Sequence, residues 1–168
     1  MISILVPKMM IQLFSELSTK TLLTHGIRCL ICDVDNTLIP HHSQCFSKDV
    51  LTFIDLIQKE GIEVILISNN VKSRIESLAK PLVVKYYGFA KKPLRITYQR
   101  ILNDSGYKPN EVACLGDQLF TDIVGANRMK MLSIYTYPLD QNDIVFTKVN
   151  RKIEKFILRK IEKRKCNE

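Results

Sequence analysis

A short apolar run that ends in two aspartates, one residue apart, constrains the fold of this chain more than any other feature. Residues 29–32 read Cys-Leu-Ile-Cys, and Asp33 and Asp35 follow directly. An apolar run of this length, bounded by polar residues, predicts a strand buried on both faces, which is typical of a parallel sheet. Asp33 and Asp35 then lie at the carboxyl end of that strand, with both side chains pointing the same way.

Two carboxylates at this spacing raise each other's pKa unless a cation lies between them. Hard oxygen ligands favour Mg²⁺ among the common divalent cations. The pair therefore indicates a metal-assisted site at the carboxyl edge of an open α/β sheet, where such sheets bind their ligands. Taken alone, an Asp-x-Asp pair fits a polar turn after a strand equally well.

The rest of the chain alternates short apolar runs with segments of helical spacing. Further strands are predicted at 63–68, 83–87, 112–115 and 131–135, and helices at 47–59, 71–80, 94–105 and 120–127. Ser47 is the predicted N-cap of the first of these helices, and Gly61 follows its end. This alternation predicts βαβ units, and hence a three-layer, doubly wound, Rossmann-like α/β fold around a five-stranded parallel sheet.

The amino-terminal residues 1–26 carry apolar side chains at intervals of four. This spacing predicts an amphipathic helical leader, which either packs on the domain or lies on a membrane surface, through Leu5, Met9, Leu13 and Leu17. Ser18 and Thr19 begin a second short helix through Leu23, which Gly26 ends. We therefore expect a leader over 1–26, a catalytic domain over 27–140, and a loop with a basic helix over 141–168 in the same single domain.

Positive charge is concentrated at the carboxyl end. The 168-residue chain has a net charge of +8, and residues 148–165 hold nine Lys or Arg against two Glu, a local +7. An apolar stripe at helical spacing runs through the same segment, which predicts a helix that packs the stripe on the sheet, through Val149, Ile153, Phe156, Ile157 and Ile161. Such charge is a statement about partners rather than about fold.

The solvated cations of this segment suit either an anionic membrane surface or RNA. RNA binding calls for aromatic side chains interleaved with the cations, and here Phe156 is already assigned to the apolar stripe. Nucleic acid is therefore the less favoured partner, and reversible contact with an anionic membrane the more favoured one. The cysteines at 29, 32 and 114 lie in apolar runs, where Cys behaves as a small buried hydrophobe. The chain also has no apolar run long enough to span a bilayer. Both features favour a cytoplasmic protein, peripheral at the inner face of the membrane.

Three further polar fragments follow predicted strands. Ser68-Asn69-Asn70 comes after the second strand and Lys91-Lys92-Pro93 after the third. Gly116-Asp117 follows the fourth strand, and Asp122 lies five residues beyond Asp117. Hydroxyl and amide groups hold phosphate oxygens, a lysine neutralises an anion, and a third carboxylate completes a metal site.

With Asp-Val-Asp-Asn-Thr-Leu, these fragments form an ordered motif set that resembles the haloacid dehalogenase (HAD) phosphatase superfamily. More narrowly, the chain resembles the YqeG family of the IIIA type, related to mitochondrial phosphatidylglycerophosphate (PGP) phosphatases. The leader, Gly-Ala-Asn-Arg at 125–128 and Asn-Arg-Lys-Ile-Glu at 150–154 carry this narrower likeness. The resemblance covers nearly the whole chain.

The resemblance implies a role for each motif residue. Asp33 corresponds to the nucleophile that becomes an aspartyl phosphate, and Asp35 to the acid that protonates the leaving oxygen and later activates water. Asp33, the backbone carbonyl of Asp35, and Asp117 would bind Mg²⁺. For Asp122 two roles stay open, orienting the water shell of the metal or capping the helix that follows.

The remaining motif residues would bind the phosphorylated substrate. Ser68 and the Asn69 amide would hold phosphate oxygens, Lys92 would offset the charge on the transferring group, and Thr37 would fix the loop through hydrogen bonds. Lys91 is interpreted as a solvated charge, and the histidines at 41 and 42 as surface-loop residues.

Neither interval in which this superfamily inserts a cap domain is long enough to hold one, so we expect an open site that admits a bulky substrate. The narrower resemblance implies PGP as that substrate, cleaved to phosphatidylglycerol. The alternatives are a soluble sugar phosphate or nucleotide, and a weakly catalytic or non-catalytic RNA- or ribosome-associated assembly module. The oligomeric state stays open.

Overall fold

A six-stranded parallel sheet forms the centre of the protein. The computed structural model describes residues 2–140 and 145–165. The strands lie in the order β1-β6-β5-β2-β3-β4, and all the pairings between them are parallel. They comprise β1 (Met9–Ile11), β2 (Cys29–Asp33), β3 (Glu63–Ile67), β4 (Lys85–Tyr87), β5 (Val112–Gly116) and β6 (Leu132–Thr136). The predicted parallel α/β sheet is confirmed, but with six strands rather than five.

The strand order reverses at β2, which creates the crevice where the site lies. From β2 the chain builds β3 and β4 on one side, then crosses over to add β5 and β6 on the other. β2 pairs along its length with both β3 and β5, and every residue of β2 and β5 is buried. Parallel sheets bind ligands at such a switch point, outside the carboxyl ends of the strands.

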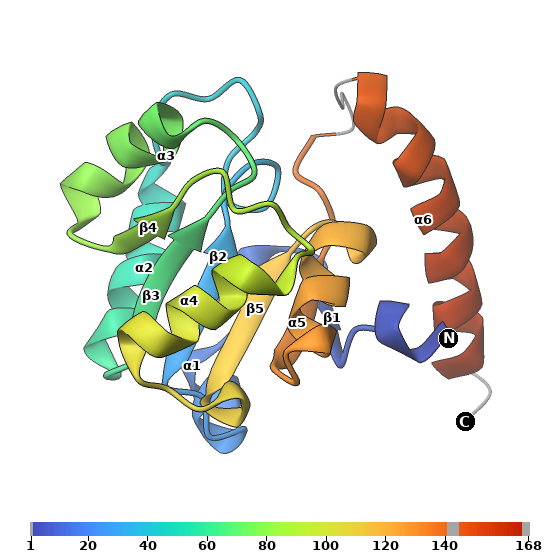
Figure 1. The fold of residues 1–168 in the computed structure, drawn as a ribbon, viewed down its shortest axis with the longest axis horizontal. Coiled ribbons are helices and arrows are strands. Elements are labelled where there is room, and N and C mark those ends of the chain that lie inside the picture. Colours follow the sequence, from blue (N-terminus) through green and yellow to red (C-terminus); the bar gives the residue numbers. More distant parts are fainter. Residues whose placement is uncertain (1, 141–144, 166–168) are drawn as a thin grey trace.

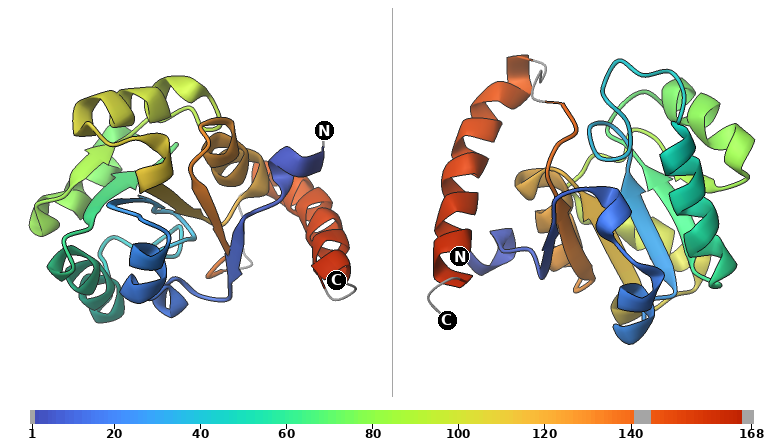
Figure 2. Two further views of the ribbon diagram at one scale, coloured as in Figure 1. Left: turned by 90° about the horizontal axis from the view of Figure 1, so that it is seen from below. Right: turned by 180° about the vertical axis from the view of Figure 1, so that it is seen from behind.

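Helices cover both faces of the sheet and give three layers (Figures 1 and 2). One face is covered by α1 (Thr19–Thr24), α2 (Lys48–Lys59) and α3 (Lys72–Ala79), and the other by α4 (Arg95–Ser105) and α5 (Val124–Arg128). Short 3-10 turns join these elements, at Ile2–Leu5, Phe14–Glu16, Lys80–Leu82 and Pro109–Glu111. The Ser47 side chain accepts a hydrogen bond from the Val50 amide, so the predicted N-cap of α2 is confirmed.

The cysteines of β2 follow its alternation. Cys29 and Cys32 are three residues apart, so they point to opposite faces of the sheet and join different core clusters. Both are free thiols, and burial raises the pKa of Cys29 to about 12. They act as small core residues, as their apolar surroundings predicted.

The amino-terminal segment corrects the expectation of a helical leader. Only the second predicted helix is present, as α1, whose N-cap Ser18 accepts a hydrogen bond of 3.1 Å from the Thr21 amide. The preceding residues form two 3-10 turns and the edge strand β1, in which Met10 is paired with Tyr135 of β6. The helix predicted from the four-residue apolar spacing is wrong, because β6 offers an unpaired edge and backbone pairing along that edge outweighs weak helical periodicity.

The carboxyl-terminal helix α6 (Val145–Lys165) lies beside the β6 side of the sheet (Figure 1). Its buried face carries Leu158 and Ile161, each 5% exposed, whereas Ile153 and Phe156 are 48% and 59% exposed. The predicted stripe is therefore wrong for Ile153 and Phe156; Val149 lies outside the described side chains. Leu158 packs in a cluster with Leu119, Ile123 and Tyr135, and this contact sets the rotation of the helix. Within residues 2–140 and 145–165, no helix combines the length and apolarity needed to cross a bilayer.

Candidate active site

The predicted motifs come together at the carboxyl ends of three adjacent strands. Asp33 is the last residue of β2, Ser68 follows β3, and Asp117 follows β5. All three are almost completely buried, with exposed fractions of 4% or less. Because the strands are parallel and neighbours in the sheet, residues far apart in the sequence converge on one edge.

Asp33 lies at the centre of the polar contacts. The Lys92 ammonium contacts the Asp33 carboxylate and, at 2.7 Å, that of Asp122. The Thr37 hydroxyl lies 3.0 Å from Asp33 Oδ2 and 3.3 Å from Asp117 Oδ1. Lys92 and Thr37 therefore bridge the three carboxylates and hold their side chains in one place.

The same carboxylates form a group that suits a cation. Single oxygens of Asp33, Asp117 and Asp122 lie within 4.8 Å of one another, and all three side chains are buried. Burial raises the pKa of Asp33; Lys92 opposes the shift, and the Asp122 and Asp117 charges add to it. Burial also disfavours the charged form of Lys92, but Asp122 and Asp33 outweigh this and raise its pKa, so the ammonium persists. An all-oxygen ligand set with excess negative charge fits a hard divalent cation such as Mg²⁺.

Asp122 is placed by an unusual turn rather than by a regular helix. The predicted helix over 120–127 begins as a short π-helix, Leu119–Ile123, which continues into α5. Asp122 Oδ2 accepts a hydrogen bond of 3.2 Å from the Gln118 amide, so this carboxylate both stabilises the turn and belongs to the acidic group. A Cβ at Gly116 would lie 2.3 Å from Asp122 Cγ, so only glycine leaves room for this side chain.

Asp35 has different partners from the acidic group. Its Oδ2 accepts a hydrogen bond of 2.9 Å from the Ser68 hydroxyl. Its Oδ1 accepts from Arg74 of α3, with Nε at 2.9 Å and a terminal nitrogen at 2.8 Å. Arg74 was not predicted as a site residue, because a lone arginine on a short helix carries no motif signal and resembles a surface charge.

The other predicted site residues surround this centre. The Asn69 amide group bonds the backbone of Lys92 at both ends, donating to its carbonyl (3.3 Å) and accepting from its N–H (2.8 Å). Asn69 therefore positions the loop that carries Lys92. Lys91 is exposed, as is His42, while the His41 carbonyl accepts a hydrogen bond from Arg74 (2.9 Å).

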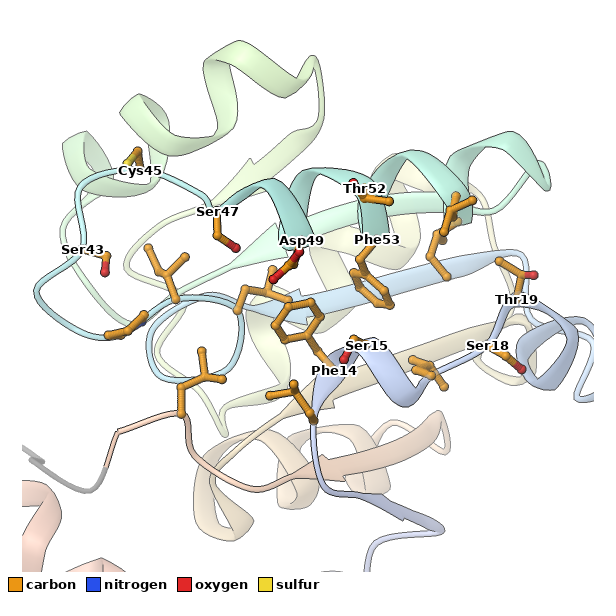
Figure 3. Close-up of a pocket in the computed structure, with 18 of the residues that line it drawn as sticks. Phe14, Ser15, Ser18, Thr19, Ser43, Cys45, Ser47, Asp49, Thr52 and Phe53 are labelled. Carbon is orange, nitrogen blue, oxygen red and sulfur yellow. The ribbon is translucent and has the colours of Figure 1, made fainter.

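A groove lies beside this site and not in it. It has a volume of about 970 Å³ and runs between α2 and the turn at Phe14–Glu16 (Figure 3). The rings of Phe14 and Phe53 meet edge to face across it, with centroids 5.3 Å apart. Leu38 and Ile39, in the loop after Asp35, line one end, but none of the site carboxylates does. The groove is therefore distinct from the buried polar cluster of Asp33, Lys92, Asp117 and Asp122.

Comparisons with known proteins agree with this geometry. A family model described as mitochondrial PGP phosphatase matches residues 2–140. The probable phosphatase YqeG of Bacillus subtilis (strain 168) is 26% identical over 149 residues, which is 89% of this chain and 87% of that protein.

Solved structures share the fold at lower identity. The cobalt-bound deoxy-D-mannose-octulosonate 8-phosphate phosphatase of Haemophilus influenzae has a TM-score of 0.56 and 13% identity, covering 80% of this chain and 89% of that one. The 3-deoxy-D-manno-octulosonate 8-phosphate phosphatase of Moraxella catarrhalis, in complex with magnesium and phosphate, has a TM-score of 0.51 and 15% identity, covering 61% and 65%. With the family match, the ordered motifs and the buried carboxylate cluster, the chain is a phosphatase of the HAD superfamily and belongs to the PGP phosphatase family.

Proposed function

We propose that this phosphatase hydrolyses phosphomonoesters in two steps, with Asp33 as the nucleophile. An Asp33 oxygen attacks phosphorus, and the bond from phosphorus to the leaving oxygen breaks while Asp35 donates a proton to that oxygen. Water then attacks the aspartyl phosphate, Asp35 takes the proton of this water, and phosphate leaves with Asp33 restored. The observation that carries the proposal is the position of Asp33, buried at the end of β2 against Lys92 and Thr37.

Other side chains of the site would stabilise the charge that develops on the phosphoryl group. Lys92, fixed by Asn69, supplies a permanent cation beside Asp33, and Ser68 holds Asp35 in place through a hydrogen bond. The carboxylates of Asp33, Asp117 and Asp122 would hold Mg²⁺. When bound, Mg²⁺ would neutralise the excess negative charge and favour the approach of an anionic phosphate.

Three proteins test this chemistry: wild type, Asp33→Asn and Asp35→Asn, assayed on an aryl phosphate with and without a chelator. We expect turnover by the wild type, loss on chelation with recovery on added Mg²⁺, and little or no turnover by Asp33→Asn. Asp35→Asn should lose less on an aryl phosphate, because a good leaving group needs little protonation. Equal activity in all three proteins, or indifference to chelator, would refute the mechanism.

For the physiological substrate we propose PGP, cleaved to phosphatidylglycerol. The description of the matching family supports this choice. The short connections between the strands beside the site support it as well. Only α2 lies between β2 and β3, and α3 with a 3-10 turn between β3 and β4, so we propose that no cap closes over the site. An uncapped site lets a headgroup enter while its acyl chains stay in the bilayer.

We further propose that α6 brings the enzyme to an anionic membrane. Its two acidic residues with described side chains, Glu154 and Glu162, face the domain, where Glu154 accepts a hydrogen bond from the Phe120 amide (3.1 Å) and Glu162 from the Tyr137 hydroxyl. Among the described side chains, 152–163, the exposed ones are cations and two apolar side chains, namely Lys152, Ile153, Lys155, Phe156, Arg159, Lys160 and Lys163. A helix face of this composition binds the boundary between lipid headgroups and acyl chains. The enzyme would then be peripheral on the cytoplasmic side.

A panel of phosphorylated lipids, sugars, nucleotides and peptides tests the substrate. Release of phosphate from PGP in vesicles, well above that from the soluble compounds, is the expected result. Good turnover of a sugar phosphate or nucleotide, with none of the lipid, would favour the soluble alternative. Tight, salt-sensitive RNA binding without turnover of any phosphomonoester would favour an RNA-associated module.

A further inference from the structure

We infer that Arg74 forms a second anion subsite, which selects substrates whose leaving alcohol carries another negative group. In PGP this group is the phosphodiester on the far side of the glycerol. The inference rests on the proposed function, because it places the leaving alcohol beside Asp35. It assigns a substrate contact to a residue that no motif of the sequence contains.

The position of Arg74 follows from its contacts. It lies in the first turn of α3, its side chain is 14% exposed, and two of its nitrogens lie 2.8 and 2.9 Å from Asp35 Oδ1. Asp35 is the residue proposed to protonate the leaving oxygen. The guanidinium is therefore one hydrogen bond away from the carboxylate proposed to protonate the leaving oxygen.

The guanidinium has donors to spare. It carries five N–H groups in a fixed plane. Its contacts within the described part of the chain use Nε and one terminal nitrogen, toward Asp35 and the His41 carbonyl. The second terminal nitrogen takes part in none of them. Its two N–H groups are available to an anion that enters through the exposed side of Arg74.

The many carboxylates of the site explain why a cation at Arg74 would affect substrate choice. Lys92 is buried against Asp33 and Asp122, so its charge serves the phosphoryl group that is transferred. Arg74 is the other cation that contacts a site carboxylate among the described residues, and it lies on the leaving-group side. A leaving alcohol with a second anion would otherwise enter a site rich in carboxylates without a cation beside it.

The reach is also suitable. A fully extended glycerol unit spans roughly 5 Å between the phosphorus-bearing oxygens at its ends, from single-bond lengths of about 1.5 Å. Arg74 reaches Asp35 through its Nε side, and its opposite edge lies farther from the reacting centre. A phosphodiester at the far end of the glycerol therefore lies within hydrogen-bonding range of that edge, where the bond is charge-assisted.

Two soluble substrates separate this role from mere support of Asp35. Glycerol 3-phosphate has no second anion, and the deacylated PGP headgroup, glycerophosphoglycerol phosphate, has the phosphodiester. Wild type should prefer the headgroup by about 10- to 100-fold in kcat/KM, the range of one hydrogen bond to a charged group. Arg74→Gln should lose most of this preference through a higher KM for the headgroup, and Arg74→Lys should keep part of it.

The matched control is Lys72→Gln, which removes an exposed cation from the same turn of α3. It should keep the wild-type preference. The inference is overturned if wild type does not prefer the headgroup, or if Arg74→Gln lowers turnover of both substrates by the same factor, since Arg74 would then only position Asp35. In either case the proposed phosphatase chemistry stands. Failure of wild type to hydrolyse either compound would overturn the inference together with the proposed substrate class.

Discussion

Removing charge from the exposed face of α6 gives the sharpest test of how this phosphatase meets its substrate. The variant carries Gln at four exposed cations that lie on one side of the helix, namely Lys155, Arg159, Lys160 and Lys163. Phe156 lies among them, and the Lys160 ammonium is 4.4 Å from the centre of its ring. None of the four belongs to the buried polar cluster around Asp33, so the site itself should be unaffected.

The expected effect follows from the number of cations. Each Lys or Arg near an anionic bilayer contributes about 1 kcal/mol, so removing four should weaken binding by about 4 kcal/mol, or roughly a thousandfold. Turnover of PGP in anionic vesicles should fall accordingly, while turnover of a soluble aryl phosphate should stay at the wild-type level. Wild-type binding should also weaken at high salt, because the Debye length shrinks from about 8 Å at physiological salt to about 3 Å at 1 M.

Vesicle co-sedimentation, with and without anionic lipid, measures the binding directly. The matched control removes four exposed lysines from other elements of the domain, at Lys20, Lys48, Lys80 and Lys108. This control should retain most of the binding, because its lysines lie away from the exposed face of α6. Equal losses in both variants would show that net charge alone matters, and unchanged binding in the α6 variant would refute the assigned face.

Three further predictions concern the interior. Gly116→Ala should destabilise the fold by about 1–3 kcal/mol and abolish most phosphatase activity, because its Cβ would displace Asp122. Gly125→Ala, whose Cβ would lie 2.4 Å from the Tyr98 ring, should also destabilise the fold but with less loss of activity per folded molecule. Thermal melts with assays on the folded fraction compare the two variants, and full activity in Gly116→Ala would contradict the site geometry. Lys92→Met should lower aryl phosphate turnover at least 100-fold, since it removes the cation between two buried carboxylates; a change below tenfold would argue against its role. Burial and the hydrogen bond to Glu162 raise the pKa of Tyr137 from 10.0 to about 12, so the folded state holds the phenolic proton more tightly than the unfolded state. The stabilising contribution of Tyr137 is therefore complete below pH 10 and should disappear as the pH rises to about 12. The thermal midpoints of wild type and Tyr137→Phe should converge over this pH interval, and a constant difference would contradict the assignment.

Local patterns in the sequence determined the elements that carry the predicted site residues. The run at 29–32 became the central strand β2, Ser47 and Ser18 became N-caps, and Asp33 was correctly placed at the end of its strand. These outcomes depend on residues within about one turn or one strand of each other. Ordered motifs after successive parallel strands must also converge, since such strands share one carboxyl edge.

Other features depended on contacts between distant segments. Residues 9–11 form an edge strand because β6 lies open beside them, which helical spacing within 1–26 could not reveal. Arg74 joined the site because α3 places it against Asp35, 39 residues earlier in the chain. No periodicity encodes such a meeting.

The carboxyl-terminal helix shows the division most directly. Apolar spacing and charge predicted the helix, but its rotation was decided by the packing of Leu158 with Tyr135 and by the bonds of Glu154 and Glu162 to the domain. Phe156 is consequently exposed among cations rather than buried. A sequence determines which faces a helix has; which face meets the domain depends on the shape and polar groups of the surface it packs against, and these exist only once the sheet has formed.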